Sequence, residues 1–160
     1  MNFRTWTIAG LLMAIGVTDA GMKAFALNSF PDEHTALGAG QGFVFLTLAI
    51  HRNPGIAFDI PIPLGIVLPI TLLICLAFAR IAYTHKSDNL PQSLGALATV
   101  IGALGNGIDR LVNGFTTDYL IFFSTSAINL SDVLILLGIL AVVWYDKRIP
   151  NPKHASETSE

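Results

Sequence analysis

The stretch Gly102–Asp132, with the sequence GALGNGIDRLVNGFTTDYLIFFSTSAINLSD, sets charged and amide side chains inside or beside sequence apolar enough to span a bilayer. A charged side chain at the bilayer centre costs about 2.5–3.5 kcal/mol on insertion scales, so such residues usually serve a function. We interpret the remainder of the chain as the scaffold that holds them at a membrane edge. The polar residues of the stretch are Asn106, Asp109, Arg110, Asp118, Asn129 and Asp132.

The composition indicates an integral membrane protein. Of the 160 residues, 52% are hydrophobic and 12% are charged, whereas a soluble domain carries about 25% charged residues. The net charge of −2 and the lack of a basic run give no indication of nucleic-acid binding. The four histidines are scattered and none forms a helical zinc pair, so no metal site is expected.

Hydrophobic runs predict the helices. Ile60–Ala79 holds twenty uncharged residues, the length that a spanning helix needs. The first run, Thr5–Thr18, also resembles a secretory signal peptide, but Asp19 and Lys23 stand where small neutral residues would precede a cleavage site, which favours a retained helix. The four predicted helices cover about residues 5–23, 60–82, 91–112 and 129–146.

Between the first two helices, about residues 24–59 predict a small β-rich segment. Asn28–Gly42 carries proline, charges and glycines and is expected to be a loop. Gly42–Ile50 is rich in β-branched and aromatic residues and predicts a strand pair or extended segment. His51–Gly55 supplies turn chemistry, and Ile56–Phe58 follows as an apolar plug. The polar tail, about 150–160, is expected to be disordered.

These segments predict one domain over 1–160, an all-α integral membrane protein whose four-transmembrane-helix bundle carries a small extracytoplasmic β-rich cradle. Four spans place both termini on one side. The positive-inside rule assigns the side richer in Lys and Arg, together with the termini, to the cytoplasm. That side holds Arg4, Arg80, Lys86, Lys147, Arg148 and Lys153, against Lys23, Arg52 and Arg110 on the other.

Asp19 and Lys23 are spaced i, i+4 and can pair on one helical face. The pair is either an interfacial salt bridge that lets Lys23 snorkel towards the headgroups, or a fixture that holds the helix beside an active site. The spacing alone favours the interfacial salt bridge.

The acidic residues suggest a site on the last two helices. Asp118 follows the third helix, and Asp132, three residues after Asn129, opens the fourth. If these helices pack antiparallel, the two carboxyl groups can meet. A close pair in low dielectric shares one proton, and it can activate water while its protonated member polarises a carbonyl. A proton or cation path, or carboxylates that only satisfy Arg110 and Lys23, fit the residues equally well.

Five ordered motifs stand along most of the chain: Asp19-x-x-x-Lys23, Asn53-Pro-Gly-Ile-Ala-Phe58, Gly102-Ala-Leu-Gly-Asn106-x-x-Asp109-Arg110, Gly114-x-x-x-Asp118 and Asn129-x-x-Asp132. They resemble the motifs of the lipoprotein signal peptidases, the bacterial type II signal peptidases. The resemblance implies an intramembrane aspartic endopeptidase of the cytoplasmic (inner) membrane. It would cut prolipoproteins on the amino side of a diacylglyceryl-modified cysteine, without cofactors, among membrane lipids, and would be inhibited by the cyclic peptide globomycin.

The resemblance also implies residue roles. The catalytic pair falls on Asp118 and Asp132. Positions that support the pair or line the substrate groove are Asn53, Gly55, Gly102, Asn106, Arg110 and Asn129. Positions important for fold or activity are Asp19, Lys23 and Asp109. Arg110 is expected to hold one aspartate or to contact a lipid headgroup.

The chain departs from the family pattern at six positions near these motifs. The family usually has glycine, two aliphatic residues, two phenylalanines and alanine where this chain has Asp59, Thr116, Thr117, Tyr119, Ile128 and Ser131, respectively. The acidic pair itself is intact.

Two other functions are considered. A small proton- or cation-coupled carrier would use the same buried carboxylates, but the chain is short, has no internal repeat and gathers its carboxylates at one face. A serine–lysine peptidase would use Lys23, but no serine stands at a helical spacing from it.

Overall fold

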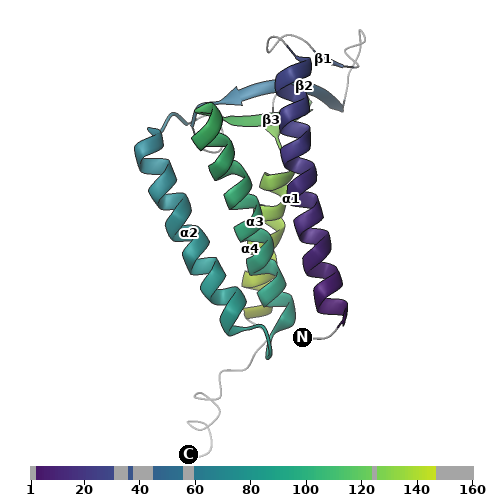
Figure 1. Cartoon of the computed structure of the whole chain (residues 1–160), viewed down its shortest axis with the longest axis vertical. Coiled ribbons are helices and arrows are strands. Elements are labelled where there is room, and N and C mark those ends of the chain that lie inside the picture. Colours follow the sequence, from purple (N-terminus) through teal and green to yellow (C-terminus); the bar gives the residue numbers. More distant parts are fainter. Residues whose placement is uncertain (1–2, 31–35, 38–44, 56–59, 124–125, 147–160) are drawn as a thin grey trace, which may run out of the picture.

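The computed structural model describes residues 3–30, 36–37, 45–55, 60–123 and 126–146. In this part of the chain, four helices form a bundle with a four-stranded sheet at one end (Figure 1). The helices are α1 (Phe3–Ser29), α2 (Leu64–Thr84), α3 (Leu90–Asn113) and α4 (Leu130–Asp146). The strands are β1 (Ala36–Leu37), β2 (Leu46–Asn53), β3 (Thr116–Phe122) and β4 (Ser126–Ile128).

Helix α3 is the centre of the bundle, because it packs against α1, α2 and α4. Small residues bring α3 and α4 close together. A Cβ atom on Gly95 would lie 2.7 Å from the Ala141 Cβ, and one on Gly138 would lie 2.8 Å from the Thr99 main-chain nitrogen. The glycines of α3 predict close helix packing, and this packing occurs against α4.

A left-handed glycine turns the chain from α3 into the sheet. Gly114 caps α3 with φ 82°, a conformation that costs little for glycine alone. Its main-chain nitrogen donates to the Arg110 carbonyl at 3.0 Å. Strand β3 begins two residues later, so the cap decides where Asp118 enters the sheet.

The sheet is antiparallel throughout, in the order β1-β2-β3-β4. On β2 and β3, His51 lies opposite Asp118 and Asn53 opposite Thr116, after a register shift between Leu48 and His51. Side chains of directly opposed residues project from the same sheet face. Asn53, Thr116 and Asp118 therefore share one face.

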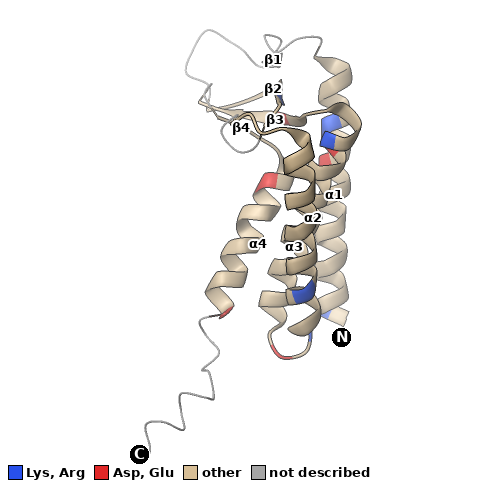
Figure 2. Cartoon of the chain, turned by 90° about the vertical axis from the view of Figure 1, so that its left-hand side faces the viewer, with Lys and Arg blue, Asp and Glu red and all other residues tan. Residues whose placement is uncertain are grey.

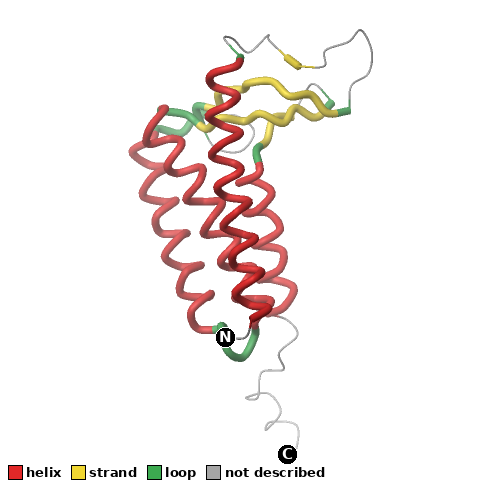
Figure 3. Tube along the Cα trace, turned by 45° about the vertical axis from the view of Figure 1, so that its right-hand side comes forward, coloured by secondary structure: helices red, strands yellow, loops and turns green. Residues whose placement is uncertain are grey.

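The other face of the sheet is covered by α1, whose upper end lies across the strands (Figure 3). Ala26 and Phe30 of this end form a buried cluster with Ile50 and Tyr119. Residues alternate between faces along a strand. Burying Tyr119 against α1 therefore directs Asp118 to the opposite face.

The ends of several elements differ from the sequence prediction. Helix α1 continues to Ser29, because residues 24–29 include neither Gly nor Pro and the Asn28 side chain donates to the Ala24 carbonyl at 2.8 Å. Strand β2 continues through Asn53, so His51–Asn53 is strand and not turn. Strand β1 lies in the segment predicted as loop. The predicted plug, Ile56–Phe58, and the tail lie outside the described residues.

Strands β3 and β4 were missed by the prediction, which placed the β-rich segment before residue 60 alone. The signal was present in Thr116–Phe122, TTDYLIF, which is rich in β-branched and aromatic residues. The fold is thus a helical bundle whose sheet draws strands from two separate parts of the chain.

The surface of the bundle is apolar along the middle of the helices, as expected for a membrane protein. Acidic and basic side chains gather towards its two ends, and the shafts between are nearly free of them (Figure 2). Helices α1 and α2 are each long and apolar enough to cross a membrane, the only two among the described residues that meet this criterion. Large apolar side chains exposed on the helices include Trp6, Leu11, Val17, Ile66, Leu72, Leu73, Leu76, Leu136, Leu137, Leu140 and Trp144.

The α3–α4 contact yields a stability prediction. Gly138→Ala places a methyl group against the Gly95 carbonyl and Thr99, and such overpacking costs about 1–3 kcal/mol. The variant should unfold at a lower temperature in detergent, measured by a thermal unfolding assay. Gly10→Ala is the control, because a Cβ there meets nothing within 4 Å. Equal melting temperatures for both variants would contradict this account of the packing.

Candidate active site

Asn129 links the carboxyl groups of the predicted catalytic pair. Its side-chain Nδ2 donates to the Asp118 Oδ1 at 2.6 Å, and its main-chain nitrogen donates to the Asp132 Oδ2 at 3.0 Å. Asn129 is fully buried. Two acidic residues from a strand and a helix are therefore held against one amide residue.

The start of α4 explains why Asp132 is positioned there. The Asp132 main-chain nitrogen donates back to the Asn129 Oδ1 at 3.0 Å, which completes a reciprocal pair of hydrogen bonds between the residue before the helix and the third residue within it. This is the geometry of a capping box. The positive end of the helix dipole also favours a carboxylate in the first turn.

Two further amides complete the hydrogen bonds of the acidic pair. Asn106 of α3 donates from Nδ2 to the Asp132 Oδ1 at 2.8 Å. Asn53 of β2 donates from Nδ2 to the Asp118 Oδ2 at 3.4 Å. The sequence prediction grouped Asn53, Asn106 and Asn129 as supporting residues, and the structure brings all three to the two carboxyl groups.

Burial changes the acidity of Asp118. Its side chain lies on β3 with 3% of the residue exposed. Loss of water, followed by the negative charge of Asp132, raises the pKa of Asp118 to about 7, against the opposing effect of the hydrogen bonds from Asn129 and Asn53. The Asp118 carboxyl group is thus about half protonated near neutral pH.

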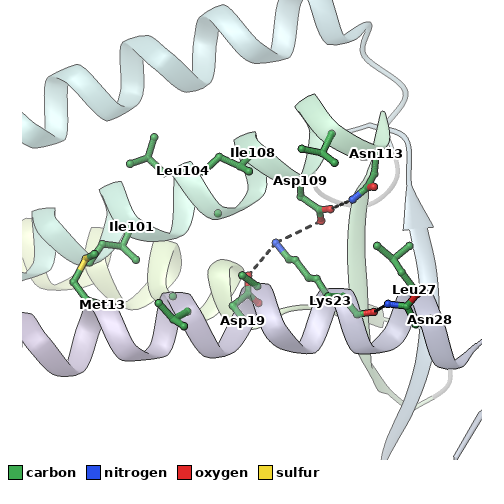
Figure 4. A pocket seen from close by; sticks show the side chains of 16 residues that line it. Met13, Asp19, Lys23, Leu27, Asn28, Ile101, Leu104, Ile108, Asp109 and Asn113 are labelled. Atoms are coloured by element: carbon green, nitrogen blue, oxygen red, sulfur yellow. Dashed lines mark hydrogen bonds and ion pairs between the residues drawn. The ribbon is translucent and has the colours of Figure 1, made fainter.

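Lys23 is buried between two acidic side chains, which corrects the expectation that it snorkels. Figure 4 shows its ammonium group pointing from α1 to a position between Asp19 and Asp109. Its Nζ lies 3.0 Å from the Asp19 Oδ2 and 3.6 Å from the Asp109 Oδ2, and it donates to the Asn106 Oδ1 at 2.7 Å. The pair predicted from the i, i+4 spacing forms, but inside the bundle.

Asp19 fastens α1 to the start of α4. Its carboxylate accepts hydrogen bonds from the Tyr119 hydroxyl at 2.9 Å, the Leu130 main-chain nitrogen at 3.0 Å and the Ser131 hydroxyl at 2.7 Å. Burial and the nearby Asp19 raise the pKa of Tyr119, so its hydroxyl stays protonated and donates. Asp19 thereby fixes the turn of helix that carries Asp132.

Asp109 fastens the end of α3 to β3. It accepts hydrogen bonds from the Thr117 main-chain nitrogen at 2.6 Å, the Thr117 hydroxyl at 3.2 Å and the Asn113 side chain at 2.7 Å. The partner roles of Thr117, Tyr119 and Ser131 were missed at the level of sequence. Their signal was that each places a hydroxyl where the family usually has an apolar residue.

Arg110 contacts the segment after β2. Its Nη2 donates to the Gly55 carbonyl at 2.9 Å, and the Gly55 main-chain nitrogen donates to the Asn53 Oδ1 at 2.9 Å. A Cβ on Gly55 would lie 2.6 Å from the Ile60 carbonyl carbon, so only glycine fits. The hydrogen bond of Arg110 thus goes to a main-chain carbonyl, and its guanidinium group also interacts electrostatically with Asp132, Asp118 and Asp109.

Gly102 acts through the helix packing. A Cβ there would lie 2.9 Å from the Ile135 side chain and would also strike the Ser131 carbonyl, one residue before Asp132. The absence of a side chain lets α3 approach the first turns of α4. This approach brings Asn106, one helical turn further along α3, within reach of Asp132.

One cavity lies beside the polar network and not at the acidic pair. It is a groove of about 770 Å³ between α1 and α3. Its walls are mainly apolar, and its polar lining comes from Asp19, Lys23, Asn28, Asp109 and Asn113 (Figure 4). Within the described residues, no three His, Cys, Asp or Glu side chains gather in a way that could hold a metal ion.

The raised pKa of Asp118 predicts a pH-dependent stability. Between pH about 4 and 7, the folded chain holds a proton on Asp118 that the unfolded chain releases, so the contribution of this residue to stability falls as the pH rises towards 7. Asp118→Asn removes the buried charge. The variant should melt about 4 °C or more above the unmodified protein at pH 8, and the gap should shrink towards pH 5.

Asp88→Asn is the control for this comparison. Asp88 is exposed, and the hydrogen bond from His85 lowers its pKa, so removing its charge should bring no gain at pH 8. If the melting temperatures of Asp118→Asn and the unmodified protein differed by the same amount at pH 5 and pH 8, the account of a buried, destabilising charge would be contradicted.

Comparison with known proteins shows the family. A profile described as "Signal peptidase (SPase) II" matches residues 11–146, most of the chain. The lipoprotein signal peptidase of Bartonella henselae is 28% identical over 145 residues, covering 85% of each chain. That of Cronobacter sakazakii is 30% identical over 143 residues, covering 83% of this chain and 84% of the relative.

Solved structures share the fold. Two structures of a bacterial membrane enzyme superpose with TM-scores of 0.68 and 0.69, each at 22% identity. The first covers 94% of this chain and 93% of its own, and the second covers 88% and 90%. From the profile match and these relatives together, the chain belongs to the signal peptidase II family, a family of peptidases.

Proposed function

We propose that this protein is an aspartic endopeptidase that removes signal peptides from diacylglyceryl-modified prolipoproteins, on the amino side of the lipidated cysteine. The names of the relatives support the substrate class. The observation that carries the catalytic type is the arrangement of Asp118 and Asp132 around Asn129.

The two carboxyl groups take different roles in the proposed reaction. Asp118, whose pKa is about 7, is the protonated member and donates a hydrogen bond to the scissile carbonyl. Asp132, at the positive end of α4 and bonded to two N–H donors, is the ionised member and takes a proton from the attacking water. The proton then passes to the leaving amine as the tetrahedral intermediate collapses.

The buried ammonium group supports this arrangement through Asn106. An ammonium group can only donate, so the Asn106 Oδ1 faces Lys23 and its Nδ2 is left to face Asp132. Lys23 therefore acts as a positioning residue. Among the described residues its Nζ contacts two carboxylates and one amide, and not the serine hydroxyl that a serine–lysine mechanism would need.

The proposed enzyme lies in the bacterial cytoplasmic (inner) membrane with four spans and both termini in the cytoplasm. Arg4, Arg80 and Lys86 belong to the end of the bundle opposite the sheet (Figure 1), in agreement with the positive-inside rule. The sheet and the acidic pair would then lie at the extracytoplasmic interface. A substrate anchored by its acyl chains and membrane lipids would reach the pair laterally from the bilayer.

The carrier hypothesis has no support from the family, and one assay separates the two functions. Asp118→Asn and Asp132→Asn should each lower cleavage of a diacylglyceryl prolipoprotein by roughly 10²–10⁴-fold, because each removes an acid or base from the reaction. Cleavage is measured in liposomes by gel shift, with globomycin expected to compete with the substrate.

Asp88→Asn, an exposed aspartate remote from the sheet, is the matched control and should cleave normally. If either Asp118→Asn or Asp132→Asn kept the activity of the unmodified protein, the aspartic mechanism would be wrong. Proton or cation flux through the liposomes without cleavage would instead favour the carrier.

Proton sharing predicts a bell-shaped pH profile. Activity needs one protonated and one ionised carboxyl group, so the rate should fall as the pH rises above about 7, where Asp118 loses its proton. It should also fall at acidic pH, where both members become protonated. Initial rates of cleavage from pH 4 to 9 test this, and a flat profile over the range would count against a shared proton.

A further inference from the structure

Two buried polar atoms close to the acidic pair lack a hydrogen-bond partner. Among the described residues, these are the Thr116 hydroxyl and the Arg110 Nε. Thr116 is 2% exposed. Burying a hydroxyl without a hydrogen-bond partner costs free energy. Such a hydroxyl next to an active site suggests that a ligand supplies the partner.

The sheet places the Thr116 hydroxyl on the same face as Asp118. The two residues are separated by one position along β3, so their side chains project to the same side, about 7 Å apart along the strand. Asn53, directly opposite Thr116 on β2, reaches Asp118 across this face. The intervening Thr117 points the other way, to Asp109.

Arg110 approaches the same place from α3. Its Nη2 donates to the Gly55 carbonyl, two residues after Asn53, and its Nε–H has no hydrogen-bond partner among the described residues. The guanidinium group also interacts electrostatically with Asp132 and Asp118. A nitrogen donor and a hydroxyl thus lie beside the Asn53–Gly55 segment, next to the acidic pair.

We propose that the Thr116 hydroxyl and the Arg110 Nε–H, which both lie near the Asn53–Gly55 segment, bind a carbonyl oxygen of the substrate next to the scissile bond. This inference rests on the proposed function. A guanidinium Nε–H can only donate, and a threonine hydroxyl can donate as well, so the group that suits both is an acceptor without a proton. The separation of about 7 Å from Asp118 along the strand matches the repeat of an extended peptide, so this carbonyl is not the scissile one.

Two parts of a lipidated substrate carry such a carbonyl: the peptide main chain and the ester groups of the diacylglyceryl moiety. Thr116 stands where the family usually has an aliphatic residue, so the subsite would be a property of this chain and not of the whole family. Its hydroxyl is expected to improve substrate binding, and in the free enzyme it has no hydrogen-bond partner among the described residues.

The test compares Thr116→Val with the unmodified full-length protein. Valine keeps the shape and removes the hydroxyl, so kcat/KM for a diacylglyceryl prolipoprotein peptide should fall about tenfold, mainly through KM, as expected for the loss of one hydrogen bond. The melting temperature should stay equal or rise, because the unpaired hydroxyl is gone. Thr116→Ser should restore most of the activity.

A second substrate identifies the carbonyl. In a peptide whose cysteine carries a dialkyl ether, the ester carbonyls are absent. If Thr116 binds an ester carbonyl, kcat/KM of the unmodified enzyme should be about tenfold lower for the ether substrate than for the ester substrate, and Thr116→Val should have the same kcat/KM for both. If Thr116 binds a main-chain carbonyl, the unmodified enzyme should have the same kcat/KM for both substrates, and Thr116→Val should lower it by the same factor for each. Either result supports the subsite.

Thr47→Val, in β2 and away from the acidic pair, is the control and should keep its kcat/KM. Unchanged kinetics of Thr116→Val on both substrates, or a Thr116→Ser variant as weak as the valine variant, would overturn the proposal. Failure of the unmodified enzyme to cleave any lipidated peptide would refute the proposed function itself and is recognised separately.

Discussion

The structure depends on one buried ammonium group. Lys23 lies among Asp19, Asp109 and Asn106, which come from two helices, and through them it reaches β3 and α4. Removing one partner of a buried ion pair costs about 3–5 kcal/mol, because the remaining charge is left uncompensated. The helices that line the site are therefore held together by buried charges, which would lose their partners without gaining contact with water if the helices separated.

One ammonium group balances two carboxylates, so the network keeps a negative charge that other donors must satisfy. Main-chain N–H groups and the hydroxyls of Thr117, Tyr119 and Ser131 do so. These hydroxyls replace residues that are usually apolar in the family, and they all serve Asp19 or Asp109. The three hydroxyls thus add hydrogen bonds to the network around Lys23, and none of them is bonded to Asp118 or Asp132 in the hydrogen bonds described above.

Close packing of α3 and α4 brings the amide side chains within hydrogen-bond distance of the acidic pair. Gly102 and Gly138 let α3 and α4 approach until Asn106 reaches Asp132. The left-handed cap at Gly114 then delivers β3 to the same place, with Asp118 on the face that α1 leaves uncovered. Hydrogen bonds to both carboxyl groups follow from backbone geometry that only small residues permit.

The sequence by itself determined the four helices and the family, because hydrophobic runs and ordered motifs can be read along the chain without coordinates. It also determined that Asp19 and Lys23 pair, since i, i+4 spacing fixes them on one helical face. Only the tertiary structure decided that Lys23 is buried, that residues after α3 form half of the sheet, and that Arg110 binds the Gly55 carbonyl. Those outcomes depend on contacts between distant segments, a hundred or more residues apart in the case of Asp19 with Tyr119 and Ser131, whose geometry no local pattern encodes.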